Sequence, residues 1–531
     1  MTHRRSWLPE FTRFVAMSAI AILGAQSVWA QTAAQPLQQG PYKRLVIRGV
    51  TIVDGTGGPP YGPADVVVEG DRITEIRVVG QPLGTINPEN RPAKGDREIE
   101  AQGMYLLPGL IDSHVHSLGP SSKRSGLGAD YYYYLNLAHG ITSIVDVVGS
   151  EPLTWNVEFS KKVKNNEVLA PRFFAFARLS AEGRPQQFDF PLVNTPEKGR
   201  EWVRAVAKAG ALGLKLRGNP PKITAAILDE AKKLGLKSTM HLEQIGQGRL
   251  TLLEAARMGL GRQDHWYGLA ESMLVDQSIP TWRTDYQYIN EQDRWRDAGR
   301  TWDHAAPAGS AAWNKLMDDL LALDFTLAPT QTFYQFLRNP MARRNADWNA
   351  EYSTPNLMKG WEFQVGNHPG IIDWTTEDEA AWNRFFVKWQ EFIREYNRRG
   401  GRIVAGSDAG SGYGLYGFSM IQDMELLQEA GLNSTEVIRS ATYFAAEYLG
   451  VEDELGSIEV GKLADMLLVD QNPLANLKVL YGTGHLRYNY QTKKLERIGG
   501  VKYTVRGGVV IDATRLRDEL KKMVRGVKEK T

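Results

Sequence analysis

Two histidines separated by a single residue are the feature of this sequence whose chemistry is easiest to name. His114 and His116 end the stretch PGLIDSHVH, and the apolar residues before them are typical of a buried parallel strand. Side chains alternate faces along a strand, so both imidazoles would point to the same side. Such a pair suits a borderline transition metal such as zinc. Two unrelated polar residues at a turn would show the same pattern, and the rest of the chain has to decide between the two interpretations.

Four further side chains of metal-binding types fall at the ends of expected strands: Lys215, His241, His265 and Asp408. Each alone has a simpler explanation, such as a solvated lysine, a hydrogen-bonded histidine or an aspartate that caps a helix. Active sites of β/α barrels form where the strands end, so the whole set would meet at one rim. The set therefore favours a metal site. Asp264 should face away from this rim if its strand alternates regularly.

From residue 107 onward the sequence alternates apolar strands with amphipathic helices. The clearest helices are residues 223–234 and 251–258. Eight strands are predicted, at residues 106–112, 143–148, 172–177, 213–216, 237–241, 263–265, 325–329 and 402–407. Eight strands alternating with helices predict an α/β fold, a closed (β/α)8 TIM barrel.

β patterns occur on both sides of this barrel, and we predict that both chain ends form one small β-sandwich. They lie at residues 44–54, 64–79 and 97–101, and again at 456–459, 464–470 and 501–512; Gly70-Asp71 is the expected hairpin turn. Helices are expected at 423–430 and 434–449. The predicted domains are the sandwich at 43–106 and 450–512, the barrel at 107–449 with insertions at about 266–320 and 331–400, and a charged, exposed helical tail at 513–531.

The first 30 residues have the pattern of a signal peptide. Arg4, Arg5 and Arg13 precede an uncharged stretch that ends in Val28-Trp29-Ala30, which predicts cleavage after Ala30. A membrane anchor is the alternative, but the strongly apolar part, residues 14–23, is shorter than the roughly 20 residues of a span. We therefore expect a periplasmic or secreted protein without a stable membrane anchor. The export route is left open.

Composition excludes several other classes of site and partner. The net charge of +2 gives no argument for binding nucleic acid. The chain contains no cysteine, which excludes disulfides, cysteine-based zinc sites and a thiol nucleophile. A small molecule is the expected partner, and a homo-oligomer is left open.

Long insertions separate His265 from Asp408. Two β/α units need about 60 residues in a barrel of ordinary size, and this gap is far longer. Ten of the fourteen tryptophans lie between Trp266 and Trp389, partly at helical spacing. The insertions would form either a lid or aromatic wall of the pocket, or else a dimer interface or the core of a helical subdomain.

Several motifs resemble those of the amidohydrolase superfamily, in the branch of imidazolonepropionase-like and dipeptidase-like hydrolases: PGLIDSHVH, AHGITSIVD, AKKLGLKSTMH, AARMGLGRQDH, AGSDAG and DELGSIEVGKLADMLLVDQNPL. The resemblance covers roughly residues 44–512 apart from the insertions. It implies one or two divalent metal ions, zinc being expected first, although manganese, cobalt or iron would suit the same donors.

The resemblance also implies a role for each candidate ligand. His114 and His116 would bind the more buried ion together with Asp408. His241 and His265 would bind the second ion, and a carbamate on Lys215 would bridge the two. If Lys215 is not carboxylated, the site would hold one ion.

What the resemblance implies for function is an exported metal-dependent amidohydrolase. A metal-bound hydroxide would attack an amide or cyclic amide C–N bond of a small molecule, with Asp408 shuttling the proton. A deaminase and an ester or phosphoester hydrolase are alternatives on the same site, and a catalytically dead binding or scaffold barrel is an alternative of another class. Arg217, Arg249 and Tyr131 are the candidates for substrate contact, the arginines because a guanidinium matches a carboxylate.

Overall fold

A computed structural model describes residues 36–81, 84–116, 119–149, 151–242, 249–276, 286, 291–363 and 373–530. Residues from Leu37 onward form one compact unit. The predicted signal peptide lies outside the described residues, so its cleavage stays a prediction. Among the helices that are described, none combines the length and the apolar character needed to cross a bilayer.

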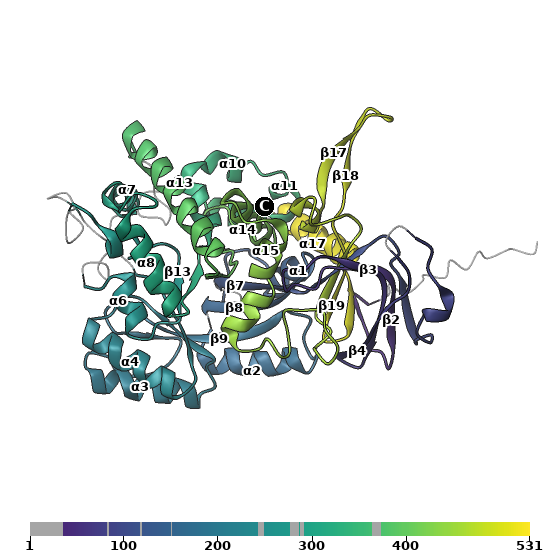
Figure 1. The fold of residues 1–531 in the computed structure, drawn as a ribbon, viewed down its shortest axis with the longest axis horizontal. Helices are drawn as coiled ribbons and strands as arrows, with labels where there is room; N and C mark the ends of the chain where they lie inside the picture. The colour runs from purple at the N-terminus through teal and green to yellow at the C-terminus, as the bar shows by residue number, and fades with distance from the viewer. Residues whose placement is uncertain are drawn as a thin grey trace, which may run out of the picture. The chain divides into compact units, whose positions relative to one another are not determined.

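Eight parallel strands in the described part of the chain curl into the predicted TIM-like barrel (Figure 1). They are β7 (Leu110–His116), β8 (Ile141–Val148), β9 (Arg172–Leu179), β11 (Gly213–Leu216), β12 (Lys237–Met240), β13 (Arg262–Asp264), β14 (Thr326–Ala328) and β15 (Arg402–Ile403). A parallel bridge between Val115 and Ala409 joins the first strand to the chain beyond the last one. The Asp408 N–H also donates to the His114 carbonyl at 2.9 Å, so the closure of the barrel joins two predicted ligands.

A second sheet combines strands from both ends of the chain, as the sequence predicts. It contains β1 (Gln38–Gln39), β2 (Leu45–Ile52), β3 (Tyr61–Glu69), β4 (Arg72–Val78), β5 (Arg97–Glu100), β6 (Tyr105–Pro108), β16 (Met466–Val469), β19 (Val501–Arg506) and β20 (Val509–Asp512). The turn between β3 and β4 is Gly70-Asp71, as predicted. Central β16 pairs antiparallel with β6 on one side and β19 on the other, which places the C-terminal strands next to the N-terminal ones.

Some predicted elements have different bounds in the structure. The strand expected at 106–112 is divided at Gly109: β6 belongs to the second sheet and β7 to the barrel. A Cβ on Gly109 would lie 2.1 Å from Thr142 Oγ1, so only glycine allows this crossing between sheets. Residues 456–459 form no strand, although the Ile458 N–H donates to the Asp54 carbonyl. The strand expected at 402–407 ends at Ile403, because the Ala405 N–H donates to the Ser440 carbonyl and not to the neighbouring strand.

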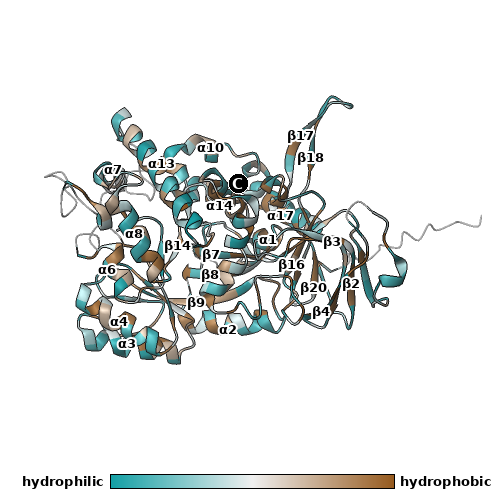
Figure 2. Ribbon diagram, in the orientation of Figure 1, coloured by the Kyte–Doolittle hydropathy of each residue, from teal (hydrophilic) through white to brown (hydrophobic). Residues whose placement is uncertain are grey.

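Helices cover the barrel: α1 (Asp130–Leu137), α2 (Leu153–Lys164), α3 (Pro196–Lys208), α4 (Pro221–Lys233), α6 (Leu252–Arg257), α8 (Ala311–Ala322), α13 (Thr376–Arg398), α14 (Phe418–Glu429), α15 (Ser434–Ser440) and α16 (Tyr443–Leu449). In Figure 2 helices such as α3 and α4 carry both hydrophobic and hydrophilic residues, as amphipathic helices do. The single helix expected at 434–449 is two, because Thr442 has a non-helical backbone (φ −136°, ψ −89°).

The insertions after β13 and β14 form several helices that share an aromatic core. They include α7 (Glu291–Thr301), α9 (Gln331–Arg338), α10 (Pro340–Arg344), α11 (Asn349–Tyr352) and α12 (Pro355–Gly360). Trp266 packs on Phe385 with ring centroids 4.8 Å apart, and Tyr334 on Trp389 at 5.6 Å. The prediction of a helical core is therefore met, and the alternative of a dimer interface stays a prediction.

The C-terminal tail is helix α17 (Ala513–Lys528), and it is not simply exposed as predicted. Leu516, Leu520 and Val524 recur every four residues, are buried, and give the helix an apolar face. The helix contacts α1 and α11. A separate two-stranded hairpin, β17 (His485–Asn489) with β18 (Lys494–Ile498), precedes it and was not predicted.

The loop after β13 carries a buried carboxyl that makes stability depend on pH. Glu271 is 7% exposed, and burial raises its pKa to about 7. Between about pH 4.5 and 7 the folded state therefore holds a proton that the unfolded state has lost, so this group lowers stability as pH rises. We expect the melting temperature of Glu271→Gln to equal that of the wild type near pH 4.5. As the pH rises to about 7, the melting temperature of the variant should exceed that of the wild type by an increasing amount. Melting curves from pH 4.5 to 8 test this, with exposed Glu158→Gln as the control; parallel curves for wild type and Glu271→Gln would contradict it.

Candidate metal centre

Three consecutive strands of the barrel are each followed, within five residues, by a residue with a left-handed backbone conformation. His265 follows β13 with φ 70°, Thr330 follows β14 with φ 50°, and Asp408 follows β15 with φ 49°. Non-glycine residues rarely adopt this conformation, and such strain concentrates at functional sites. Two of the three residues are predicted metal ligands. The turns direct their side chains back over the barrel rim.

His114, His116 and Asp408 converge on one point at this rim. His116 Nε2 lies 3.1 Å from His114 Nε2 and 2.7 Å from Asp408 Oδ1. The third separation, between His114 Nε2 and Asp408 Oδ1, is 3.5 Å. One donor atom from each residue thus falls within 4.8 Å of the other two. His114 and His116 extend from the same side of β7, as the strand alternation predicts.

The protonation states of these three groups are those that a metal ion requires. Burial lowers the pKa of His116 to about 4 and also lowers that of His114, so both imidazoles are neutral near pH 7. Burial alone would raise the pKa of Asp408, but its interactions with His114 and His116, the hydrogen bond with His116 among them, lower it, so this carboxyl is ionised near pH 7. Two imidazole nitrogens and a carboxylate oxygen, converging and unprotonated, fit a divalent transition metal such as zinc.

Lys215, His241 and His265 lie around this group. The His265 ring centroid is 5.0 Å from that of His114 and 4.6 Å from that of His241. The Nδ1 atom of His265 lies 2.5 Å from Thr330 Oγ1 and 3.8 Å from Asp408 Oδ2. Lys215 is the second-last residue of β11 and is almost fully buried, and its ammonium is paired with Asp264. The structure thus brings all six predicted ligands to one rim, although only His114, His116 and Asp408 have donor atoms close enough to share an ion.

The expectation that Asp264 faces away from the rim is wrong. Its carboxylate contacts Lys215, and its Oδ2 atom lies 3.4 Å from His114 Nδ1. The physical reason is the left-handed backbone of His265, which breaks the alternation between the two residues. Both neighbours can therefore point into the barrel. No pattern in the sequence predicts the left-handed conformation of His265.

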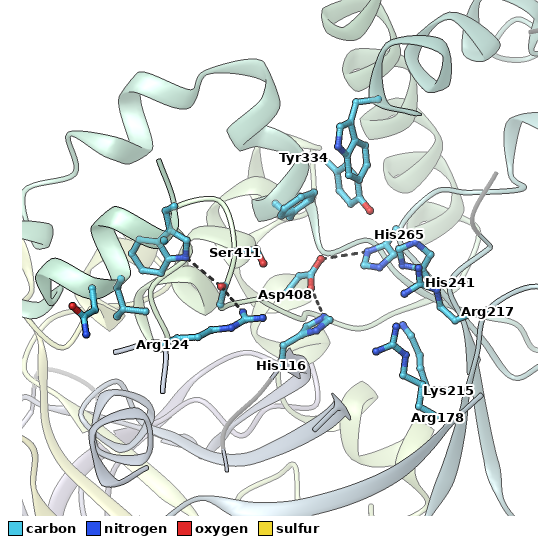
Figure 3. A pocket seen from close by; sticks show the side chains of 17 residues that line it. His116, Arg124, Arg178, Lys215, Arg217, His241, His265, Tyr334, Asp408 and Ser411 are labelled. Carbon is cyan, nitrogen blue, oxygen red and sulfur yellow. Dashed lines mark hydrogen bonds and ion pairs between the residues drawn. The ribbon is translucent and has the colours of Figure 1, made fainter. Parts of the chain in front are cut away.

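The rim opens into a cavity of about 540 Å³ (Figure 3). Five of the six predicted ligands line it, and His114 is the one that does not. Charged lining residues are mostly cationic, and aromatic residues from the insertions form part of the wall; they include Arg124, Arg178, Arg217, Trp295, Phe333, Tyr334 and Trp361. The aromatic wall predicted as one role of the insertions is therefore present.

The three residues predicted to contact the substrate lie in different parts of the structure. Arg217 lines the cavity, on the same side of Asp408 as Lys215 in the view of Figure 3. Arg249 is exposed and is not among the described residues that line the cavity. Tyr131 is buried in α1, where its hydroxyl donates to the Tyr352 carbonyl, so it packs in the core. Only Arg217 of the three is placed to meet a substrate.

Two arginines that line the cavity, Arg178 and Arg124, are not predicted from the sequence. Arg178 lies on β9, which continues to Leu179, two residues beyond the predicted end of that strand. A longer strand would have placed Arg178 near the rim. Arg124 lies in the loop after β7 and donates to the Gly410 carbonyl at 3.0 Å, as the Trp361 indole does at 3.2 Å. That loop has no periodic pattern from which to place a side chain.

Comparison with known sequences links the chain to one family. Residues 386–511, which include Asp408, match the Amidohydrolase family. A 5'-deoxyadenosine deaminase from Methanobrevibacter smithii is 48% identical over 54 residues, which cover 10% of this chain and only 12% of that enzyme. A dihydroorotase from Trichlorobacter lovleyi is 22% identical over 443 residues, 80% of this chain and 89% of that enzyme.

Solved structures share the fold over nearly the whole chain. A Xaa-Pro dipeptidase with bound methionine superposes with a TM-score of 0.58 at 19% identity, covering 88% of this chain and 100% of the other. A bottromycin amidohydrolase superposes with a TM-score of 0.61 at 16% identity, covering 93% and 91%. The barrel and the second sheet built from both chain ends therefore recur in proteins with very different sequences.

Proposed function

We propose that this chain, which matches the Amidohydrolase family over residues 386–511 and shares its fold with a Xaa-Pro dipeptidase over most of its length, is an exported, metal-dependent hydrolase that cleaves an amide or cyclic amide C–N bond of a small molecule. The observation that carries this proposal is the convergence of His114, His116 and Asp408 at the mouth of a ligand-sized cavity.

A divalent cation held by these three residues would lower the pKa of a bound water molecule and polarise a substrate carbonyl. Asp408 has one oxygen for the cation, beside His116, and a second oxygen 3.8 Å from His265. Held ionised, this carboxylate accepts the proton of the attacking water and passes it to the leaving nitrogen. The left-handed turn at Asp408 keeps both oxygens at the rim.

The number of ions depends on Lys215. Burial lowers the pKa of its amine to about 8, against the opposing effect of Asp264. A larger fraction is therefore neutral near pH 7 than for an exposed lysine, and the neutral amine is the form that adds carbon dioxide with loss of a proton. With a carbamate at Lys215, His241 and His265 would complete a second site. Without it, the protein binds one ion.

The charge of the cavity supports a substrate that carries a carboxylate. Among the described lining residues, four side chains are arginine or lysine and Asp408 is the carboxylate. N-acyl amino acids and dipeptides combine an amide with such a carboxylate, and the aromatic wall suits an apolar side chain. A guanidinium binds a carboxylate through two parallel hydrogen bonds, whereas a lysine ammonium acts as a single point charge.

Replacing Arg217 tests this assignment. We expect Arg217→Gln to raise KM for an N-acyl amino acid by about 10-fold or more, the effect of losing a hydrogen bond to a charged group, with a smaller change in kcat. The matching amide, which has no carboxylate, should be affected much less. Arg249→Gln is the control because Arg249 is exposed and is not among the described residues that line the cavity. Equal KM changes for acid and amide would refute the role of Arg217.

The function itself is tested by a hydrolysis screen of the purified chain. N-acyl amino acids, dipeptides and cyclic amides are offered with zinc, manganese or cobalt, and again after chelation. Amide cleavage that chelation abolishes and metal restores is the expected result. Release of ammonia from an adenine nucleoside would favour deamination, the activity named for the partially aligned relative. If the protein binds no metal and hydrolyses none of these compounds, the proposed hydrolase function is wrong and a non-catalytic binding protein is favoured.

Export is part of the same proposal and is supported by the sequence pattern of residues 1–30. A mature chain that begins at Gln31 in the periplasm or medium is the expected product. Mass spectrometry of the protein from its native cell measures the N-terminus directly. An intact Met1 would remove export from the proposal.

A further inference from the structure

Asp264 is the centre of a buried charge cluster beneath the metal centre. Its Oδ1 atom lies 2.9 Å from Arg262 Nη2, and its Oδ2 atom contacts the Lys215 ammonium. The same Oδ2 atom lies 3.4 Å from His114 Nδ1. Asp264, Arg262 and His114 are fully buried, and Lys215 is 1% exposed. One carboxylate thus joins two cations and a predicted metal ligand without help from solvent.

His114 depends on this carboxylate for its orientation. Its Nε2 atom faces His116 and Asp408, so its proton belongs on Nδ1 if Nε2 is to bind a cation. Within the described part of the chain, His114 Nδ1 is buried and has no hydrogen-bond partner of good geometry, and Asp264 is the carboxylate nearest to it. An N–H in that position points toward a negatively charged group.

We infer that Asp264 is a positioning residue of the metal centre: it holds the proton of His114 on Nδ1 and so turns the Nε2 lone pair toward the cation. This inference rests on the proposed metal-dependent function. Histidine ligands in proteins commonly donate their other N–H to a carboxylate, which fixes the ring and raises its basicity. The left-handed turn at His265 is what allows two adjacent residues, Asp264 and His265, to serve the same site.

Arg262 explains how a carboxylate can remain charged at this depth. Its guanidinium lies over the Tyr448 ring at 4.6 Å, and its Nε donates to Thr239 Oγ1 at 3.1 Å. This fixed cation balances Asp264 whatever the state of Lys215. A lysine Nζ keeps at least one N–H both as an ammonium and as a carbamate, so Lys215 has an N–H to offer Asp264 in either state. The cluster therefore supports the histidine ligand with either one or two ions bound.

The test is Asp264→Asn, since an amide NH2 can donate to His114 Nδ1 and move the ring proton to Nε2. We expect affinity for Zn²⁺, measured by chelator competition, to fall about 10- to 100-fold, as on loss of other such partners. The visible absorption spectrum of the Co²⁺ form should change as well. Asp465→Asn is the matched control: it also removes a buried, arginine-paired carboxylate, but at the junction of the two sheets. It should keep wild-type affinity and spectrum.

Two outcomes overturn the inference. The first is an Asp264→Asn protein with wild-type zinc affinity and cobalt spectrum, whatever its stability. If that variant does not fold, Arg262→Met combined with Asp264→Asn removes both charges together, and wild-type affinity in this double variant is the second overturning outcome. Weakened affinity in the double variant supports the inference. A wild-type chain that takes up no cation overturns the proposed function itself, and this inference with it.

Discussion

Replacing Asp408 by asparagine is expected to lower kcat/KM by about 10³-fold or more. General acid–base catalysis alone contributes about 10²- to 10⁴-fold, and this residue is also a proposed ligand of the cation. An asparagine at 408 keeps the shape of the side chain but loses the charge that balances His114, His116 and a cation. Because the asparagine amide does not titrate, activity should not be recovered at any pH. Steady-state kinetics and metal content of the same preparation measure both effects.

The matched control is Asp229→Asn, on the outer helix α4, where the side chain is 45% exposed. It should keep wild-type kinetics and metal content. An Asp408→Asn protein with more than a tenth of wild-type activity would mean that another group moves the proton.

Replacing Asp465 by asparagine is expected to lower the free energy of unfolding by about 3 kcal/mol, the low end for breaking a buried ion pair. Asp465 lies in the motif GKLAD and accepts two hydrogen bonds from Arg172, at 2.7 and 2.9 Å. It also accepts one from the Gly507 N–H at 2.7 Å. These contacts join the start of barrel strand β9 to the turn between β19 and β20, so the substitution leaves the Arg172 guanidinium without its anion at the junction.

Urea unfolding measures this loss. Glu158→Gln is the comparison, because its ion pair with Lys161 is exposed on α2 and such pairs contribute about 0 to 1 kcal/mol. Equal destabilisation by the two substitutions would show that the junction does not depend on the Arg172–Asp465 pair.

Much of the architecture followed from local patterns. Strand β11 has the bounds predicted, and helix α6 begins at Leu252, one residue after the predicted Thr251, which is its N-cap and forms a capping box with Glu254. Alternation along β7 placed His114 and His116 on one side. These features depend on residues within one turn or one strand, so neighbouring residue types are enough to predict them.

Other features depended on contacts between distant segments. The helix expected at 434–449 is broken at Thr442, and the tail helix α17 buries an apolar face against α1. Arg249 and Tyr131 have side chains suited to a substrate, but one is exposed and the other lies in the core. The type of a residue determines what its side chain can bind, but the packing of the chain determines which groups that side chain can contact.

The sequence by itself determined the order of strands and helices, the family resemblance and the kinds of metal ligand that this protein offers. Those depend on periodicity and on chemical type, which are local properties. The tertiary structure alone decided that three strand ends turn left-handed, that His114, His116 and Asp408 have donor atoms within 4.8 Å, and that Asp264 faces inward. The physical reason is that backbone strain at His265 and Asp408 is tolerated only when the closed barrel holds both residues from several sides.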